Sequence, residues 1–256
     1  MHISGSVANL SLSGLEDNYY HFLVELSARI HMMQAKRITP DHFIISKSKT
    51  FQKDFSSLLG IPPEKVLTLQ QDTVIQADQL IVTSLINNYE VIKFRGFTHY
   101  QKKHLPLWTD NIYQKVRAKK RGTKKVYISR KLAKYRKILN EDRLVEILEA
   151  KGFESVHLET YSIREQITLF QQSSVIVAPH GAGLVNMSFS APGTKIFELF
   201  PQYYHDHSYI LHAYQLKHHY NYMIGTSPFS PEIPAQEEDI HIDLDLFKEA
   251  LKKLSL

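Results

Sequence analysis

The sequence contains no cysteine among its 256 residues. This absence excludes disulfide bonds, cysteine nucleophiles and thiolate-bound metals, and it is typical of a protein kept in a reducing cytoplasm. No apolar run approaches the roughly 18 residues that a membrane-spanning helix needs, and no signal peptide is visible after Met1. We therefore expect a cytoplasmic protein.

Two further absences concern phosphate and metal sites. The sequence contains neither GxGxxG nor a Walker loop, the two best-known phosphate-binding fingerprints. Its 14 histidines include no HExxH arrangement. Asp243-Leu244-Asp245 matches the DxD pattern that binds metal in one class of sugar transferases, but it starts a predicted helix, where aspartate is an ordinary cap. We expect no metal ion and no other cofactor.

Positive charge is concentrated in one part of the chain. The net charge is +5, yet 12 lysines or arginines and no acidic residue lie between Lys115 and Lys137. One interpretation is a solvated linker and strand flank. The other is a surface for an anionic partner, such as phosphates, an acidic glycan or the inner face of a membrane. Nucleic acid is not expected, because aromatic residues are not interleaved as a base-stacking platform requires.

The second half of the chain alternates between strand and helix patterns. The predicted strands are Lys125 to Ser129, Ser155 to Leu158, Ser174 to Ala178, Lys195 to Leu199 and Tyr220 to Ile224. The predicted helices are Asn140 to Ala150, Ile163 to Gln171, Ala182 to Phe189, His207 to Leu216 and Leu244 to Leu254. This spacing predicts an α/β fold with a parallel, doubly wound sheet and a ligand site at the carboxyl ends of its strands.

The first half of the chain is less regular. Apolar residues recur at three- and four-residue spacing from about Asn18 to Lys36, which predicts a long helix. Short strands are predicted at Phe43 to Ser46, Val66 to Leu69 and Gln79 to Thr83. Residues 85 to 108, which include Trp108, show no clear period, and we expect a loop or hinge there.

The most informative segment follows the apolar strand that ends at Ala178. His180-Gly181-Ala182-Gly183 forms a glycine turn between this strand and a short helical pattern. Free amides at the start of a helix point toward an anion, and glycines let the backbone approach a phosphate closely. The alternative is a tight turn whose glycines serve packing alone. The pattern favours a phosphorylated or nucleotide-bearing ligand.

Three other groups of residues could contribute to such a site. Asp17, His21, Glu25 and Arg29 have the spacing of one helix face, so a carboxylate could orient His21 as a general base, or the residues could be a solvated stripe with Asp17 or Asn18 as the cap. Arg130 closes a strand and Arg136 follows it, so both could clamp a diphosphate or simply belong to the basic run. Gln166 could orient a loop, although a solvated position is the simpler reading.

The glycine turn and its neighbours resemble the signature of glycosyltransferase family 61, which includes bacterial surface-polysaccharide enzymes. The resemblance rests on HGAGL at 180–184, then Asn186 and Phe189, and Glu198-Leu199 at the end of a later strand. The upstream motifs occur in the same order. They are Asn18-Tyr19-Tyr20-His21-Phe22, Ile128-Ser129-Arg130, Arg136, Asn140-Glu141 and Gln166. Many relatives carry tryptophan where this chain has Phe22.

The resemblance implies a GT-B-like fold, with two Rossmann-like domains that face each other across a cleft. On that model residues 1–115 form a short acceptor-side domain, residues 116–240 bind the nucleotide sugar, and residues 241–256 form a terminal helix. The donor-binding residues would be Arg130, Arg136, Gln166, His180, Gly181, Ala182, Gly183, Asn186 and Glu198. Glu198 would accept hydrogen bonds from ribose hydroxyls. His21 would be the catalytic base, with Asp17 or Glu25 as the alternative.

The expected function is therefore that of an inverting, metal-independent glycosyltransferase. It would move a hexose or pentose from a nucleotide sugar to a glycan or glycolipid acceptor during surface or capsular polysaccharide synthesis. Two other interpretations remain at this point. One is a nucleotide-sugar or phosphosugar enzyme of another class, such as an epimerase, and the other is a glycan-binding module without catalysis.

Overall fold

The computed structural model describes residues 1–11, 17–45, 49–67, 69, 73–84, 88–94, 97–104, 113–228 and 232–256. Contacts between residues divide the chain into two compact units, Met1–Ile86 and Asn87–Leu256. The functional boundaries expected after residues 115 and 240 stay predictions.

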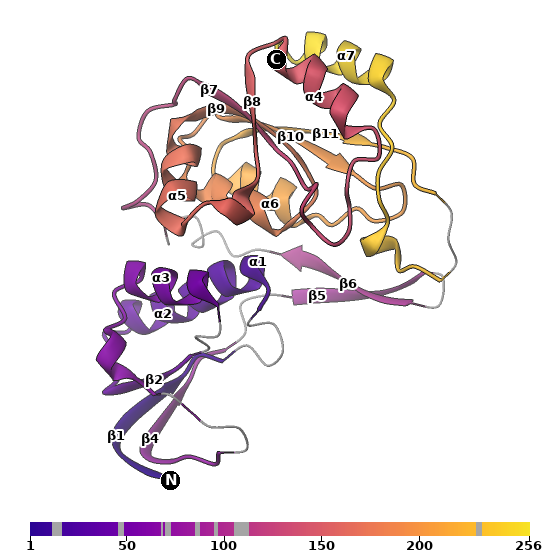
Figure 1. The fold of residues 1–256 in the computed structure, drawn as a ribbon. Coiled ribbons are helices and arrows are strands. Elements are labelled where there is room, and N and C mark those ends of the chain that lie inside the picture. Colours follow the sequence, from indigo (N-terminus) through magenta and orange to yellow (C-terminus); the bar gives the residue numbers. More distant parts are fainter. Residues whose placement is uncertain are drawn as a thin grey trace. The chain divides into compact units, whose positions relative to one another are not determined.

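The first unit contains a four-stranded parallel sheet. Its strands, indigo to purple in Figure 1, are β1 (His2–Asn9), β2 (His42–Ile44), β3 (Val66–Leu67) and β4 (Gln76–Val82). They are arranged in the order β3-β2-β1-β4, and all three pairings are parallel. This is the 3-2-1-4 order of a Rossmann half, in which the connections change direction between the first and fourth strands.

The long helix expected in this unit is present but is not uniform. It consists of α1 (Tyr19–His21), a π-helical turn η1 (Phe22–Leu26) and α2 (Ser27–Ala35). Asn18 is the cap, because its side chain accepts hydrogen bonds from the amides of Tyr20 and His21. A second helix, α3 (Thr50–Leu58), follows, and a 3-10 turn, η2 (Pro63–Lys65), precedes β3. Phe22 makes edge-to-face contacts with Phe51 and Phe55 of α3.

The second unit contains the parallel, doubly wound sheet that the sequence predicts. Its strands are β7 (Lys124–Ile128), β8 (Phe153–Val156), β9 (Ser173–Pro179), β10 (Lys195–Phe200) and β11 (His219–Ile224). Their order is β11-β10-β9-β7-β8, and every pairing is parallel. Numbered along this sheet, the order is 2-1-3-4-5, so the connections reverse direction between β7 and β9. Ligands of such sheets bind outside the carboxyl ends of the strands at that point.

Helices cover both faces of this sheet (Figure 1). On one face lie α4 (Glu141–Glu149) and α7 (Leu244–Lys253), and on the other lie α5 (Ile163–Gln172) and α6 (Ser208–Gln215). Tyr127, Val177 and Phe197 point toward the first face, where they pack with Leu148 of α4 and Phe247 of α7. Because residues in a strand alternate between faces, Glu198 belongs to the face covered by α5 and α6.

The described part of the second unit also contains short helical turns. They are η4 (Leu158–Thr160), η5 (Ala182–Phe189) and η6 (Ala235–Glu237). The turn η5 is the helical segment expected after the glycine turn, and it is a 3-10 helix of eight residues. Every described residue of η5 from Leu184 to Phe189 is buried. Packing of this buried segment therefore holds the glycine turn that precedes it in place.

The expectation of a loop over residues 85 to 108 is wrong for the described part of that segment. It contains β5 (Asn88–Phe94) and β6 (Phe97–His104), which pair in antiparallel register. Trp108 lies outside the described residues. None of the described helices is both long and apolar enough to cross a membrane.

The basic run between Lys115 and Lys137 is divided by β7. Lys119, Lys120 and Arg121 precede the strand, and the Arg121 guanidinium lies 3.3 Å from the carbonyl oxygen of Gly193, which precedes β10. Arg130 follows the strand at its carboxyl end. Parallel strands carry their two ends to opposite edges of a sheet, so the run contributes to two surfaces rather than one.

Candidate active site

The carboxyl ends of β7 and β9, where the sheet order reverses, bring together Arg130 and the glycine turn. Arg130 comes two residues after β7, and His180 directly follows β9. A Cβ atom added to Gly181 would lie 2.1 Å from Nη1 of Arg130, so the guanidinium lies against the turn. The first amides of a helical turn have no partner inside it. Arginine and free amides therefore meet at the position where this class of sheet binds its ligand.

The glycines are needed here for space. Gly181 has an extended backbone with φ of 178°, which any residue can adopt. Its missing side chain makes room for Arg130, while a Cβ on Gly183 would lie 2.7 Å from Cδ1 of Leu158. The interpretation of these glycines as packing residues is correct in part. Their close packing also brings Arg130 to the turn.

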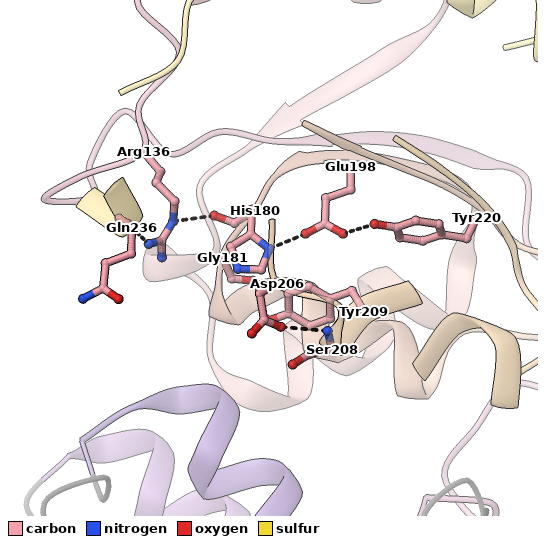
Figure 2. Close-up of polar contacts among 9 residues, drawn as sticks. All are labelled: Arg136, His180, Gly181, Glu198, Asp206, Ser208, Tyr209, Tyr220 and Gln236. Carbon is pink, nitrogen blue, oxygen red and sulfur yellow. Dashed lines mark hydrogen bonds and ion pairs between the residues drawn. The ribbon is translucent and has the colours of Figure 1, made fainter. Parts of the chain in front are cut away.

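Arg136 connects its own loop to the segments that contain His180 and Gln236, at the same edge of the sheet (Figure 2). Its Nε donates to the carbonyl oxygen of His180 at 2.8 Å, and its Nη1 donates to the carbonyl oxygen of Gln236. Its guanidinium also lies 4.8 Å from the ring centre of Tyr135. Arg136 adopts a φ of 57°, an unusual conformation for a residue with a side chain. The surrounding contacts hold a second positive charge beside the turn.

His180, Glu198 and Tyr220 form a continuous hydrogen-bonded chain (Figure 2). The distance between Nδ1 of His180 and Oε1 of Glu198 is 2.5 Å, and the Tyr220 hydroxyl donates to Oε2 of Glu198 at 2.5 Å. Glu198 is completely buried and His180 is 6% exposed. The His180 ring stacks on Phe200 with centres 5.1 Å apart. Both oxygens of Glu198 thus bond inside the protein, so this arrangement favours support of His180, and ribose contact stays a prediction.

Burial opposes charge on both members of the His180–Glu198 pair. Desolvation raises the pKa of Glu198 well above its usual value. Desolvation, with Arg136 as the next cause, lowers the pKa of His180 to about 3. Both shifts favour a pair without net charge, in which one proton lies between Oε1 and Nδ1.

Arg130 keeps its charge despite its surroundings. Desolvation and the nearby Arg136 lower its pKa to about 10, which still leaves it protonated at neutral pH. Its Nη2 donates to the carbonyl oxygen of Tyr135 at 2.9 Å. Arg136, which is close enough to lower the pKa of Arg130, and Arg130 itself create a local positive potential that an anionic ligand would relieve.

Gln166 and Asn186 are brought together beneath the turn. The Asn186 amide donates to Oε1 of Gln166 at 2.7 Å, and the Gln166 amide donates to the carbonyl oxygens of Leu158 and Tyr161. Asn186 is completely buried and Gln166 is 8% exposed. The simpler reading of Gln166 as a solvated residue is wrong, and the reading as a loop-orienting residue is confirmed. Direct donor contact by either amide stays a prediction.

The candidate acceptor-side residues lie in the first unit. Nδ1 of His21 lies 2.7 Å from Oε1 of Glu25, which is buried. Asp17 lies 3.6 Å from Nζ of the exposed Lys49, and both side chains are more than half exposed. Arg29 donates to the carbonyl oxygen of Ser11 at 2.7 Å. Of the two carboxylates considered, Glu25 is therefore the one that orients His21.

Sequence reasoning missed several residues around His180. Tyr209 donates to the carbonyl oxygen of Gly181 at 2.7 Å, and Tyr204 contacts the His180 ring edge to face. Asp206, whose Oδ1 accepts a hydrogen bond from the Ser208 amide, also acts electrostatically on His180. Tyr220 supports Glu198. No motif or spacing in the sequence links these residues to the turn. Tyr220 comes from β11, Tyr209 from α6, and Tyr204 and Asp206 from the loop after β10.

The described residues include no group of three or more histidine, aspartate or glutamate side chains placed to hold a metal ion. The DxD match has a structural role, because Oδ1 of Asp243 accepts hydrogen bonds from the amides of Asp245 and Leu246. The expectation that Asp243 caps the terminal helix is confirmed. Whether a metal takes part in the reaction stays a matter of prediction.

Comparison with known proteins identifies the family of this chain. The family model of Glycosyltransferase 61 matches residues 19–197, which include His21, Arg130, the glycine turn and the first half of β10. Similar curated proteins are EGF domain-specific O-linked N-acetylglucosamine transferases. The Drosophila melanogaster protein is 31% identical over 110 residues, 42% of this chain and 20% of the relative. The Mus musculus protein is 31% identical over 112 residues, with the same shares of the two chains covered.

A shorter match, to the Xenopus laevis transferase of the same name, is 37% identical over 71 residues, which are 26% of this chain and 14% of the relative. The matched part is thus about a fifth or less of the length of these relatives. The family match covers well over half of this chain, and the chain belongs to glycosyltransferase family 61.

Proposed function

We propose that this protein transfers a sugar from a nucleotide sugar to a hydroxyl group of a glycan or glycolipid, with inversion at the anomeric carbon. The observation that carries the proposal is the contact of Arg130 with Gly181 at the point where the sheet order reverses. Family membership supports the reaction class. The relatives' names make an activated N-acetylglucosamine the first donor to test.

On the donor side, the reaction places negative charge on a leaving nucleoside diphosphate. Arg130, Arg136 and the free amides of Ala182 and Gly183 supply positive charge there before the reaction starts. Pre-positioned donors of this kind stabilise developing charge without having to reorient. We propose that they do what a divalent metal does in other transferases, so that turnover needs no metal.

On the acceptor side, we propose that His21 removes the proton from the attacking hydroxyl. Glu25 holds Nδ1 at 2.7 Å, which orients the ring and stabilises the imidazolium that forms. The Nε2 atom is then the one that takes the proton. This role requires the two units to face each other across the substrates, as in a GT-B enzyme, and the arrangement is part of the proposal.

We also propose that the protein works at the cytoplasmic face of a membrane during surface polysaccharide synthesis. The amino-terminal edge of the second sheet carries Lys119, Lys120, Arg121 and Lys217, and the adjoining Tyr214 is 79% exposed. Basic residues beside an exposed tyrosine suit an anionic lipid surface. Charge reversal of Lys119, Lys120 and Arg121 should abolish sedimentation with anionic vesicles. Unchanged sedimentation would remove this part of the proposal.

The central proposal is tested by thermal unfolding with a panel of nucleoside diphosphates and nucleotide sugars, with and without EDTA. A ligand that binds only the folded protein raises the melting temperature by mass action. We expect a shift for one nucleotide class that EDTA does not change and that Arg130→Ala removes.

Turnover assays separate the alternatives. Release of diphosphate that depends on an acceptor glycan supports transfer, whereas conversion of the nucleotide sugar alone would indicate an epimerase or hydrolase. Binding of a glycan without any response to nucleotides would indicate a module that does not catalyse. A thermal shift that needs a divalent metal would contradict metal independence.

A further inference from the structure

The Tyr220–Glu198–His180 chain satisfies both oxygens of the buried Glu198 carboxyl group. The Tyr220 hydroxyl donates to Oε2 of Glu198, which leaves Oε1 to share a proton with Nδ1 of His180 at 2.5 Å. Glu198 is completely buried, so it cannot find water as another partner. A buried carboxyl group with both oxygens bonded is costly to rotate.

The number of protons on the His180–Glu198 pair decides whether Nε2 of His180 donates or accepts a hydrogen bond. If the pair has no net charge, the shared proton lies on Oε1 or on Nδ1, and in both cases Nε2 also carries a proton. If the pair loses one proton, Nδ1 donates to the carboxylate and Nε2 becomes an acceptor. The first state makes His180 a hydrogen-bond donor, and the second makes it a base.

We propose that Glu198 and Tyr220 hold His180 with a proton on Nε2, so that this nitrogen donates a hydrogen bond to the leaving diphosphate of the donor. Tyr220 acts as a positioning residue through Glu198. The inference rests on the proposed function, since it assigns a role to His180 within the same site. It gives the two histidines of the family motifs different roles. His180 donates a hydrogen bond to an anion, and His21 is the base.

The groups that face His180 agree with this role. Arg136 and Arg130 are positive, and the exposed His205 has a pKa lowered by desolvation. Asp206 is a carboxylate outside the pair that also acts on the ring. A diphosphate at this position would accept the hydrogen bond from Nε2, while Arg130 and Arg136 balance its negative charge. No proton would leave or enter the pair.

The state of His180 can be read directly from the free protein. Nitrogen-15 labelling of histidine distinguishes a protonated ring nitrogen from an unprotonated one, and loss of the signal in His180→Gln assigns it. We expect Nε2 of His180 to be protonated at pH 7. An unprotonated Nε2 would overturn the inference without affecting the proposed function.

The conservative variant Glu198→Gln makes the sharpest comparison. Because the Tyr220 hydroxyl must donate, it directs the amide oxygen toward itself and leaves the amide N–H for Nδ1. This arrangement copies the protonated carboxyl group, so Nε2 should stay protonated. Affinity for inorganic pyrophosphate, measured by calorimetry, should stay within about threefold of the parent, a factor worth less than one typical hydrogen bond. If His180 were a base with an ionised partner, the exchange should cost orders of magnitude in turnover, as it does in a catalytic triad.

The positioning role of Tyr220 is tested against its neighbour on the same strand. Tyr220→Phe removes one hydrogen bond to Glu198 and should weaken pyrophosphate binding about fivefold. Tyr222→Phe is the matched control, because Tyr222 is 57% exposed and its hydroxyl makes no hydrogen bond within the described part of the chain. Equal effects of the two variants would overturn the role of Tyr220. Absence of pyrophosphate binding to the parent would overturn both this inference and the proposed donor site.

Discussion

Nη1 of Arg130 occupies the space that a side chain on residue 181 would need, since a Cβ on Gly181 would come within 2.1 Å of it. Gly181→Ala should therefore push Arg130 away from the turn. Because the displaced atom is the end of a flexible side chain, we expect a stability loss of only about 1 kcal/mol. Pyrophosphate affinity should fall about tenfold, or 1.4 kcal/mol.

The control for this prediction is a double-mutant cycle. Arg130→Ala removes the side chain that would clash. In the Arg130→Ala background, Gly181→Ala should therefore cost little stability, while the affinity for pyrophosphate stays low. Urea unfolding and calorimetry measure the two effects. Additive stability losses would mean that Gly181 and Arg130 are not coupled.

The second prediction concerns the acceptor side. His21→Gln should lower kcat by about 10²- to 10⁴-fold, the usual contribution of a general base. Donor affinity should not change, because the proposed donor site lies in the other unit. Glu25→Gln should lower kcat less, because the ring loses its charged partner but keeps a hydrogen bond.

Asp17→Asn is the comparison for this pair. Asp17 is exposed and faces Lys49, and such surface pairs contribute about 0 to 1 kcal/mol. We therefore expect a smaller change in kcat than for Glu25→Gln. A larger effect of Asp17→Asn would identify Asp17 as the base and His21 as its support.

The third prediction is a loss of stability in acid caused by His218. Desolvation lowers the pKa of this residue to about 4, with the nearby Arg117 and His219 acting in the same direction, while its Nε2 bonds the carbonyl oxygen of Met187. The unfolded chain, with a histidine pKa near 6.5, binds the proton more readily. Stability is thus present above pH 6.5 and is lost as the pH falls toward 4. His218 should account for about 2 kcal/mol of the loss between pH 7 and pH 5.

His218→Gln keeps a hydrogen-bond donor for Met187 but cannot titrate. Urea unfolding of the variant at pH 7 and pH 5 should show a shallower dependence than the parent. His219→Gln, at a more exposed position beside it, should leave the dependence unchanged. Equal slopes for parent and His218→Gln would contradict the prediction.

The fourth prediction concerns the buried amides beneath the glycine turn. Asn186→Ala leaves Oε1 of Gln166 without its donor, and this should cost about 1 to 3 kcal/mol. Because the partners share one hydrogen bond, the double variant with Gln166→Ala should lose less than the sum of the single variants. The free energy of unfolding in urea measures the coupling, and strict additivity would show that the amides act independently.

The sequence was most informative where apolar runs and glycines coincide. Val175 to Ala178 and Lys195 to Leu199 could be predicted as buried strands, and the turn between them as an anion site, because apolar strands and glycine turns leave strong local patterns. The strand His2–Asn9 was not predicted, because its residues are mostly polar or small and its pairing partners come from distant parts of the chain. Asn88–Phe94 and Phe97–His104 were also not predicted, although they pair with each other, because charged and polar residues interrupt their apolar pattern.

The site was predictable in its motif residues but not in its supports. Arg130, His180 and Gly181 follow strand ends, and strand ends can be located from the sequence. Tyr220 reaches Glu198 only because β10 and β11 pair in parallel with a particular register. Register depends on the assembled sheet, so no local pattern reveals it. Likewise, an i,i+4 spacing suggested contact between His21 and Glu25, whereas nothing in the sequence distinguished a π-helical turn from an α-helical one.

That π-helical turn, Phe22–Leu26, determines how the helix would respond to the loss of one residue. A wide turn accommodates one residue more than an α-helix would, and each residue of an α-helix rotates the chain by about 100°. Deleting one residue from the turn should therefore restore a uniform α-helix in which Ile30 and Met33, both buried, keep their direction relative to His21, whereas deleting a residue at the start of α2 should rotate them by about 100°. The turn is therefore the one part of this helix that could lose a residue while His21 and the buried side chains of α2 stay on their present faces.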